Sequence, residues 1–209
     1  MTFTPRVEEI STPVGPARTT TEGRPGAATL VLGHGAGGGI DALDLLAARD
    51  AGLAAGLQVV RVEQPWRVRG GKVAEAPARL DLAWTAILEQ LDGPLVVGGR
   101  SAGARVACRT ADALDAVAVL ALAFPLAPPR RPERARLPEL LAPRSPRLVV
   151  QGSRDAFGVP APGPQLEVHV VAGADHAFAV RRRDGRSAPD VRREVVDVVT
   201  GWLRRQTLT

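Results

Sequence analysis

The segment Gly98 to Gly103 constrains the fold more than any other part of the chain. It contains the pattern G-x-S-x-G and lies between a segment typical of a strand and a segment typical of a helix. The apolar run Leu95 to Val97 precedes it, and an Ala- and Arg-containing segment with helical propensity follows it. A sharp turn that exposes a serine hydroxyl needs small neighbours, and Gly99 and Gly103 permit strained dihedral angles and close backbone contacts. We therefore expect a buried strand, a tight turn at Ser101 and a helix.

Similar short apolar runs recur along the chain and predict the strands of a buried parallel sheet. They end at Leu32 or cover Leu57 to Val62, Leu95 to Gly98, Ala116 to Leu122, Arg147 to Gln151 and Leu166 to Val171. Apolar residues at helical spacing over 80–91 and 191–203 predict two helices, the second with Ser187 and Pro189 as start signals. This alternation predicts an α/β fold with a mostly parallel central sheet flanked by helices. Residues 6–10 and 17–21 are candidates for additional edge strands.

Composition indicates one soluble globular domain covering residues 1–209, because 45% of the residues are hydrophobic and no linker or internal repeat interrupts them. No apolar run is long enough to cross a membrane, and the first residues, which include Glu8 and Glu9, lack the apolar stretch of a signal peptide. We expect a cytoplasmic protein without a membrane partner. The proline-rich segment 125–146 is too short for a separate lid domain, so we expect a minimal lid.

The net charge of +5 comes almost wholly from arginine, since Lys72 is the single lysine. Basic chains often bind nucleic acids. Here the arginines are spread along the sequence, only 3% of the residues are aromatic, and no nucleic-acid-binding motif is present. A solvated basic surface without a nucleic-acid partner is therefore the favoured interpretation.

Three residue types suited to nucleophilic catalysis follow three predicted strands. Ser101 comes first in the chain, Asp155 follows the run that ends at Gln151, and His176 follows the run that ends at Val171. Residues just past the carboxyl ends of parallel strands meet at one edge of the sheet. Serine supplies a hydroxyl nucleophile, imidazole accepts its proton near neutral pH, and a carboxylate orients the imidazole. Asp175 is the competing carboxylate, but its position next to the histidine makes a hydrogen bond to that ring awkward.

The glycine-rich segment Gly33 to Gly39 follows the first central strand and has two interpretations. As a phosphate-binding loop it lacks the Gly-Lys-Ser/Thr ending, and no acidic residue stands where a dinucleotide site needs one. As an oxyanion loop it would supply the backbone N–H of Ala36, which together with that of Ala102 would bind a developing negative charge. We favour the oxyanion loop.

Simpler interpretations exist for several of these polar residues. Ser101 could be a turn residue and Asp155 a turn or cap residue, His34 is expected to form hydrogen bonds within its loop, and His169 is expected to be packed or exposed. Cys108 is expected to be a buried thiol. No His, Asp, Glu and Cys cluster has the spacing of metal ligands, so we expect neither a metal nor a cofactor. Arg100, Trp66 and Arg67 are candidates for substrate contacts at the rim of the pocket, where arginine could favour an anionic substrate.

Several stretches together resemble those of a known family; they are Gly33 to Gly38, Glu63 to Trp66, Gly98 to Arg105, Phe124 to Pro129, Gln151 to Gly158 and Asp175 to Phe178. With them the chain resembles proteins of the α/β-hydrolase fold. More narrowly it is similar to a small dienelactone-hydrolase-like branch that includes a testis-expressed protein and the regulatory subunit of the NSL histone acetyltransferase complex. The chain departs from that branch at Ala127, where histidine is common, at Arg130, where glycine is common, and at Ala156, where proline is common.

The resemblance and the three strand-end residues predict a serine hydrolase that cleaves a small-molecule ester or thioester through an acyl-enzyme. The alternative is a non-catalytic protein-interaction module on the same fold, because a fold does not determine a function. A cofactor-free haloperoxidase-like reaction at the same three residues is a third possibility that the sequence leaves open.

Overall fold

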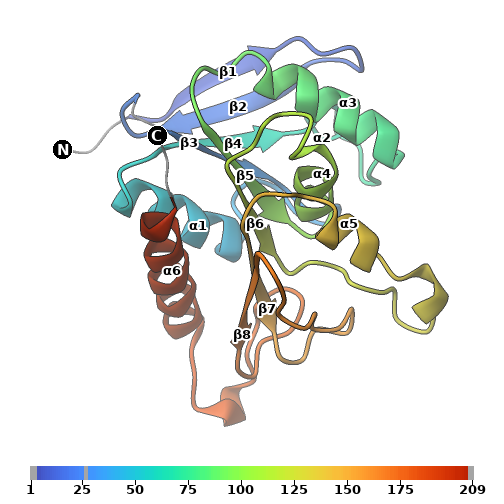
Figure 1. The fold of residues 1–209 in the computed structure, drawn as a ribbon, viewed down its shortest axis with the longest axis vertical. Helices are drawn as coiled ribbons and strands as arrows, with labels where there is room; N and C mark the ends of the chain where they lie inside the picture. Colours follow the sequence, from blue (N-terminus) through green and yellow to red (C-terminus); the bar gives the residue numbers. More distant parts are fainter. Residues whose placement is uncertain (1–3, 26–27, 207–209) are drawn as a thin grey trace.

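A computed structural model describes residues 4–25 and 28–206, which form an eight-stranded sheet of order β1-β2-β4-β3-β5-β6-β7-β8 (Figure 1). The strands are β1 (Arg6–Ile10), β2 (Ala17–Glu22), β3 (Thr29–Gly33), β4 (Gln58–Glu63), β5 (Leu95–Arg100), β6 (Ala118–Leu122), β7 (Arg147–Gly152) and β8 (Leu166–Val171). β2 pairs antiparallel with β1 and β4, and every other neighbouring pair is parallel. The expected mostly parallel sheet with added N-terminal edge strands is confirmed.

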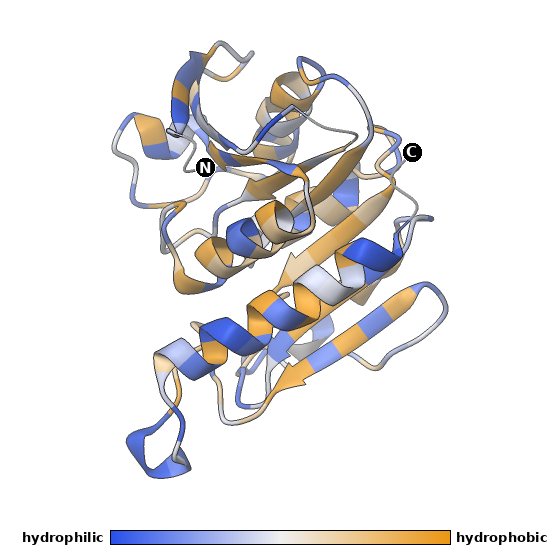
Figure 2. Cartoon of the chain, turned by 90° about the vertical axis from the view of Figure 1, so that its left-hand side faces the viewer, coloured by the Kyte–Doolittle hydropathy of each residue, from blue (hydrophilic) through white to orange (hydrophobic). Residues whose placement is uncertain are grey.

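Helices cover both faces of this sheet. Helices α1 (Leu43–Ala54) and α6 (Ala188–Arg205) pack side by side on one face. The other face carries α2 (Pro65–Val68), α3 (Pro77–Leu88), α4 (Ala102–Thr110) and α5 (Leu137–Leu141). In Figure 2, α1 and α6 lie before the sheet, and apolar and polar residues alternate along α6 as on a helix with one buried side.

The central strands are apolar on both sides because both of their faces are covered. Along β3, Leu30 and Leu32 pack against the α1 and α6 side, whereas Val31 between them packs against the α3 and α4 side. Val96 and Val97 of β5 divide in the same way. Successive side chains point to opposite faces, and both faces are buried. Apolar residues are therefore favoured at successive positions, and the parallel strands are recognisable in the sequence as continuous apolar runs.

The predicted helices differ from the observed ones mainly at their ends. Helix α6 begins after Ser187, whose hydroxyl accepts the Asp190 N–H while the Asp190 carboxylate accepts the Ser187 N–H, and Pro189 occupies its first turn. The apolar stripe expected to run to Leu91 stops earlier, because α3 ends at Leu88. Leu91 still packs against the same core from the following turn.

The proline-rich segment between β6 and β7 contains a 3₁₀ turn (Pro132–Arg134) and the short helix α5. Glu139 of α5 forms a two-bond ion pair with Arg105 of α4, at 2.7 and 2.8 Å, and accepts a further bond from Arg109 at 2.9 Å. The segment is therefore held against the helix that follows Ser101, in agreement with the expected minimal lid. Within residues 4–25 and 28–206, none of the helices has the combined length and apolar character that crossing a bilayer demands.

Candidate active site

Three loops at the carboxyl edge of the sheet bring Ser101, His176 and Asp155 into one hydrogen-bonded chain. The Ser101 hydroxyl lies 3.1 Å from Nε2 of His176, and Nδ1 of His176 lies 2.7 Å from Oδ2 of Asp155. Nδ1–H donates to the carboxylate, which leaves Nε2 free to accept the serine proton. The arrangement can therefore move a proton from a hydroxyl to an imidazole that a carboxylate orients.

Ser101 occupies a strained turn between β5 and α4, with φ of 52° and ψ of −108°. A side chain in this region costs about 1–3 kcal/mol, so the surrounding structure has to hold it there. Tight packing does so, because a Cβ at Gly99 would stand 2.5 Å from the Gly33 oxygen and a Cβ at Gly103 only 2.3 Å from it. The end of β3 thus rests directly on the serine turn, which confirms that the two glycines permit close backbone contact.

A backbone donor and burial hold the Asp155 carboxylate in place for its contact with His176. Its side chain is fully buried, and its Oδ1 accepts the Phe157 N–H at 2.9 Å. The Phe157 ring lies against the His176 ring, with 4.6 Å between the ring centroids. Asp175, the competing carboxylate, instead accepts the N–H groups of Ala177 and Ala179 and so shapes the histidine turn.

Sequence reasoning missed Gln151, which supports the same carboxylate from the end of β7. Its buried Nε2 donates to Oδ2 of Asp155 at 2.7 Å and to the Gly158 carbonyl at 3.0 Å. Its neighbour Gly152 lets the histidine loop approach, since a Cβ there would stand 2.4 Å from the Ala174 oxygen. A glutamine directly after the apolar run Leu148 to Val150 was the available signal.

The predicted oxyanion residues are Ala102, which follows Ser101 directly, and Ala36, whose neighbour Gly35 contacts the serine turn. Ala102 is the first residue of α4, where a backbone N–H has no acceptor within the helix. Gly35 is in contact with the serine turn, since a Cβ at Gly35 would lie 3.4 Å from Cβ of Ser101, and Ala36 follows it on the surface. The structure thus brings Gly35, the neighbour of Ala36, into contact with Ser101, while the oxyanion role of Ala36 and Ala102 stays a prediction.

His34 connects the glycine-rich segment to the residue that follows β4. Its Nε2 accepts the Gln64 N–H at 3.1 Å, so its Nδ1–H donates to the Gly35 carbonyl at 2.9 Å. Burial lowers the pKa of His34, which keeps the ring neutral and both contacts intact. The expected structural role of His34 agrees with these contacts.

The three residues predicted to contact substrate differ in position. Trp66 is buried, and its ring centroid lies 5.4 Å from that of His34. The Arg100 guanidinium faces inward, toward Asp44 of α1 and the His176 carbonyl, and is not a free cation at the rim as we had expected. Arg67 on α2 is partly exposed. The internal contacts of Arg100 remove the reason to expect an anionic substrate from this residue.

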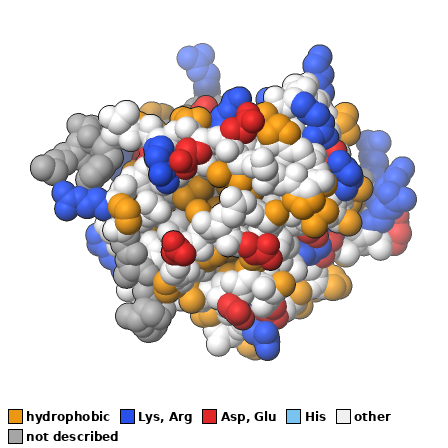
Figure 3. Space-filling view, turned by 90° about the horizontal axis from the view of Figure 1, so that it is seen from above, with side chains coloured by type: hydrophobic (Ala, Val, Ile, Leu, Met, Phe, Trp, Pro, Cys, Tyr) orange, Lys and Arg blue, Asp and Glu red, His pale blue; other side chains and the backbone are white. Residues whose placement is uncertain are grey.

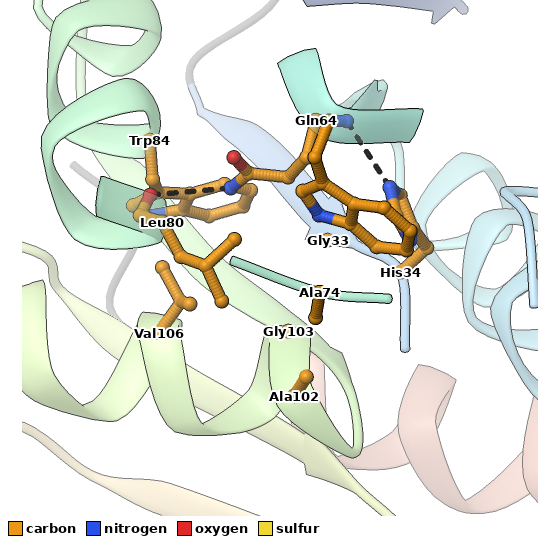
Figure 4. A pocket seen from close by; sticks show the side chains of 10 residues that line it. Gly33, His34, Gln64, Ala74, Leu80, Trp84, Ala102, Gly103 and Val106 are labelled. Carbon is orange, nitrogen blue, oxygen red and sulfur yellow. Dashed lines mark hydrogen bonds between the residues drawn. The ribbon is translucent and has the colours of Figure 1, made fainter. Parts of the chain in front are cut away.

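A small cavity of about 10 Å³ lies between the glycine-rich segment after β3 and the start of α4 (Figure 4). Its lining includes Gly33 and His34 of the glycine-rich segment, Ala102 and Gly103 of α4, and the side chain of Trp66. Figure 4 shows Gln64 above this space, with its side-chain amide bonded to the Leu80 carbonyl. Trp66 therefore borders the same small space as Ala102, one of the two predicted oxyanion donors.

The remaining polar residues form ordinary structural contacts. His169 on β8 bonds to Glu194 of α6 at 2.7 Å, and burial raises the pKa of the Cys108 thiol to about 12. On the face seen in Figure 3, positive and negative side chains are interspersed. In the part of the chain that the structure describes, no group of three or more His, Cys, Asp or Glu side chains could hold a metal ion.

Solved structures with the same fold include several serine hydrolases. XC6422 from Xanthomonas campestris, a lidless α/β serine hydrolase, is 20% identical, with 97% of each chain covered and a TM-score of 0.72. An α/β serine hydrolase homologue from Coxiella burnetii is 20% identical, with 95% of this chain and 99% of that one covered and a TM-score of 0.73. Est1E from Butyrivibrio proteoclasticus, solved with ferulic acid bound, is 13% identical over 97% of this chain and 100% of that one, with a TM-score of 0.71.

At 20% identity or less, these similar structures show which fold the chain has. The family is shown by a separate comparison with models of protein families. No curated protein matched the sequence. The model described as an alpha/beta hydrolase domain matches residues 26–204, a range that includes the serine turn, the acid turn and the histidine turn. The chain therefore belongs to the α/β hydrolase domain family.

Proposed function

We propose that this protein is a serine hydrolase that cleaves a small ester or thioester, with Ser101 as nucleophile, His176 as general base and acid, and Asp155 as the orienting carboxylate. The observation that carries the proposal is the hydrogen-bonded chain through these three side chains at the strained serine turn. Structural neighbours described as serine hydrolases or as an esterase support hydrolase activity in general.

The proposed reaction has two steps with the same proton carrier. In the first, Oγ of Ser101 attacks the acyl carbon as its proton moves to Nε2 of His176, and the N–H groups of Ala36 and Ala102 bind the oxyanion. The C–O or C–S bond then breaks, and the leaving group takes the proton from Nε2. In the second step, water gives a proton to the same nitrogen and attacks the acyl carbon. The bond from that carbon to Oγ of Ser101 then breaks, Oγ takes the proton back from Nε2, and the acid leaves.

A fluorophosphonate probe tests this assignment, because it labels a serine only where the hydroxyl is activated. The proposal expects one adduct on Ser101 of the folded wild-type protein and none on Ser101→Ala. Ser153→Ala is the matched control, since Ser153 also follows a strand end but bonds to the Gly173 N–H and not to a histidine. Failure of the wild type to react, or equal labelling of Ser101→Ala, would overturn the proposal.

The substrate class is tested by a panel of p-nitrophenyl esters, acyl thioesters and lactones, each run beside Ser101→Ala. Within the family we propose membership of the dienelactone-hydrolase-like branch, on the motifs described above. If no acyl substrate turns over and a stoichiometric protein partner binds wild type and Ser101→Ala alike, the interaction-module alternative replaces the hydrolase.

A further inference from the structure

We propose that Arg100, held by the buried Asp44, is a positioning residue that fixes the His176 loop and the oxyanion loop around Ser101. This inference rests on the proposed function, because it explains how the reacting groups keep their geometry. It assigns the arginine inside the G-x-S-x-G motif to the alignment of the site and not to the binding of substrate.

The Arg100 side chain joins three parts of the structure that are distant in the sequence. Its Nε lies 3.0 Å from Oδ2 of Asp44, and its Nη2 donates to the His176 carbonyl oxygen at 2.8 Å. Its Nη1 lies 3.0 Å from where a Cβ at Gly35 would stand, so the guanidinium also packs against the oxyanion loop. One planar group thus contacts the start of α1, the histidine loop and the oxyanion loop.

Asp44 and Arg100 carry opposite charges, and both side chains are largely shielded from water. The Asp44 side chain is 2% exposed and the Arg100 side chain 13% exposed. The other oxygen of Asp44 accepts the Leu45 N–H, so the carboxylate is anchored to α1. A buried guanidinium with a fixed counter-ion presents its donors in one direction, which a flexible lysine cannot reproduce.

The contact with His176 acts on the backbone, next to the catalytic ring. The imidazole must lie 3.1 Å from the serine oxygen and 2.7 Å from Asp155 at the same time. The histidine lies in a loop beyond β8, and Arg100 donates to this loop from the residue that precedes Ser101. A displacement of the ring by about 1 Å lowers a rate by roughly 10²-fold, so a backbone contact at this point has a direct kinetic consequence.

The test compares the kinetics of fluorophosphonate labelling, separated into the maximal labelling rate kinact and the half-saturating concentration KI. The first variant is the double substitution Asp44→Leu with Arg100→Met, which removes both charges together and so leaves no unpaired buried ion. We expect it to fold, to keep KI within about 2-fold, and to lose roughly 10- to 100-fold in kinact.

A conservative variant and a matched control complete the experiment. Arg100→Lys keeps the cation beside Asp44 but cannot contact both partners, so we expect partial rescue, with kinact between the wild type and the double variant. The control is Glu167→Gln with Arg205→Gln, which removes an exposed ion pair between β8 and α6 and should leave both constants unchanged.

The outcomes separate this inference from the proposed function. A wild-type protein that does not label refutes the proposed function before Arg100 is tested. If the wild type labels, an unchanged kinact in the folded double variant overturns the inference, and so does a loss confined to KI, which would indicate substrate binding. If the double variant unfolds in a thermal melt, Arg100→Lys decides, because a wild-type kinact there overturns the inference.

Discussion

Gly103→Ala tests the packing of the serine turn most sharply, because helix propensity and the structure predict opposite signs. Alanine is favoured over glycine in a helix by about 1 kcal/mol, so propensity alone predicts a more stable protein. The structure instead puts the new Cβ 2.3 Å from the Gly33 oxygen, 2.5 Å from its carbonyl carbon and 2.9 Å from the His34 oxygen. The first contact is about 1 Å shorter than the 3.4 Å at which ordinary contact begins.

All three opposing atoms belong to the backbone, so a side-chain rotation cannot relieve the overlap. Overpacking of this kind costs about 1–3 kcal/mol or more, and we expect a net loss of about 2 kcal/mol, seen as a fall in Tm of roughly 4–8 °C. The shift also moves the oxyanion loop relative to Ser101, so the fluorophosphonate labelling rate should fall roughly 10²-fold.

Gly201→Ala in α6 is the matched control for this substitution. It is also a helical glycine, but the nearest atom to its new Cβ is Nη1 of Arg205 at 3.9 Å. We expect Tm to rise by about 2–4 °C with no change in labelling. A Gly103→Ala protein that is as stable as the wild type and labels at the same rate would refute the account of the serine turn.

Three further substitutions probe the surroundings of the site. Gln151→Met keeps the side-chain volume but removes the donor to Asp155, so we expect a loss of about 1–3 kcal/mol in urea unfolding and slower labelling, and an unchanged labelling rate would contradict this role. Burial raises the pKa of Asp44 to about 6, so the folded state binds its proton more tightly than the unfolded state and gains stability from this group as the pH falls below 6. The wild type should therefore be about 1 kcal/mol more stable relative to Asp44→Asn at pH 5 than at pH 8, and a pH-independent difference in urea unfolding would contradict the buried carboxylate. Trp66→Leu enlarges the cavity beside Ala102 at a cost of about 2–4 kcal/mol, and a panel of p-nitrophenyl esters should show longer acyl chains gaining relative to acetate, whereas an unchanged chain-length profile would show that Trp66 does not limit the acyl group.

The positions of Ser101, Asp155 and His176 were predictable because each follows an apolar strand. A strand buried on both faces has a continuous apolar sequence, and parallel strands deliver the residues after them to one edge. Helix α1 was not singled out, since Leu43–Ala54 is rich in alanine and leucine on several sides and has no side-chain N-terminal cap. Its hydrophobic pattern is therefore weak, although its packing against α6 is extensive.

The supporting residues could not be found in the same way, because their partners are distant in the chain. Asp44 and Arg100 belong to different elements and meet only when α1 packs beside β5. Their ion pair therefore cannot be predicted from the spacing of residues within either segment. Arg100 was therefore interpreted as a rim cation from its place in the motif alone. Trp66 was expected at the rim for a similar reason, because the sequence alone does not show whether an aromatic residue after a strand is exposed in a pocket or buried. In the structure it is buried.

The most direct test of the central claim is intact-protein and peptide mass spectrometry of the wild type after reaction with a p-nitrophenyl ester that acylates quickly and deacylates slowly. The account predicts a mass increase equal to one acyl group, located on Ser101, which is absent in Ser101→Ala and greatly reduced in His176→Ala. An unmodified Ser101 in folded, substrate-exposed protein that nevertheless hydrolyses the ester, or an acyl group on another residue, would contradict it.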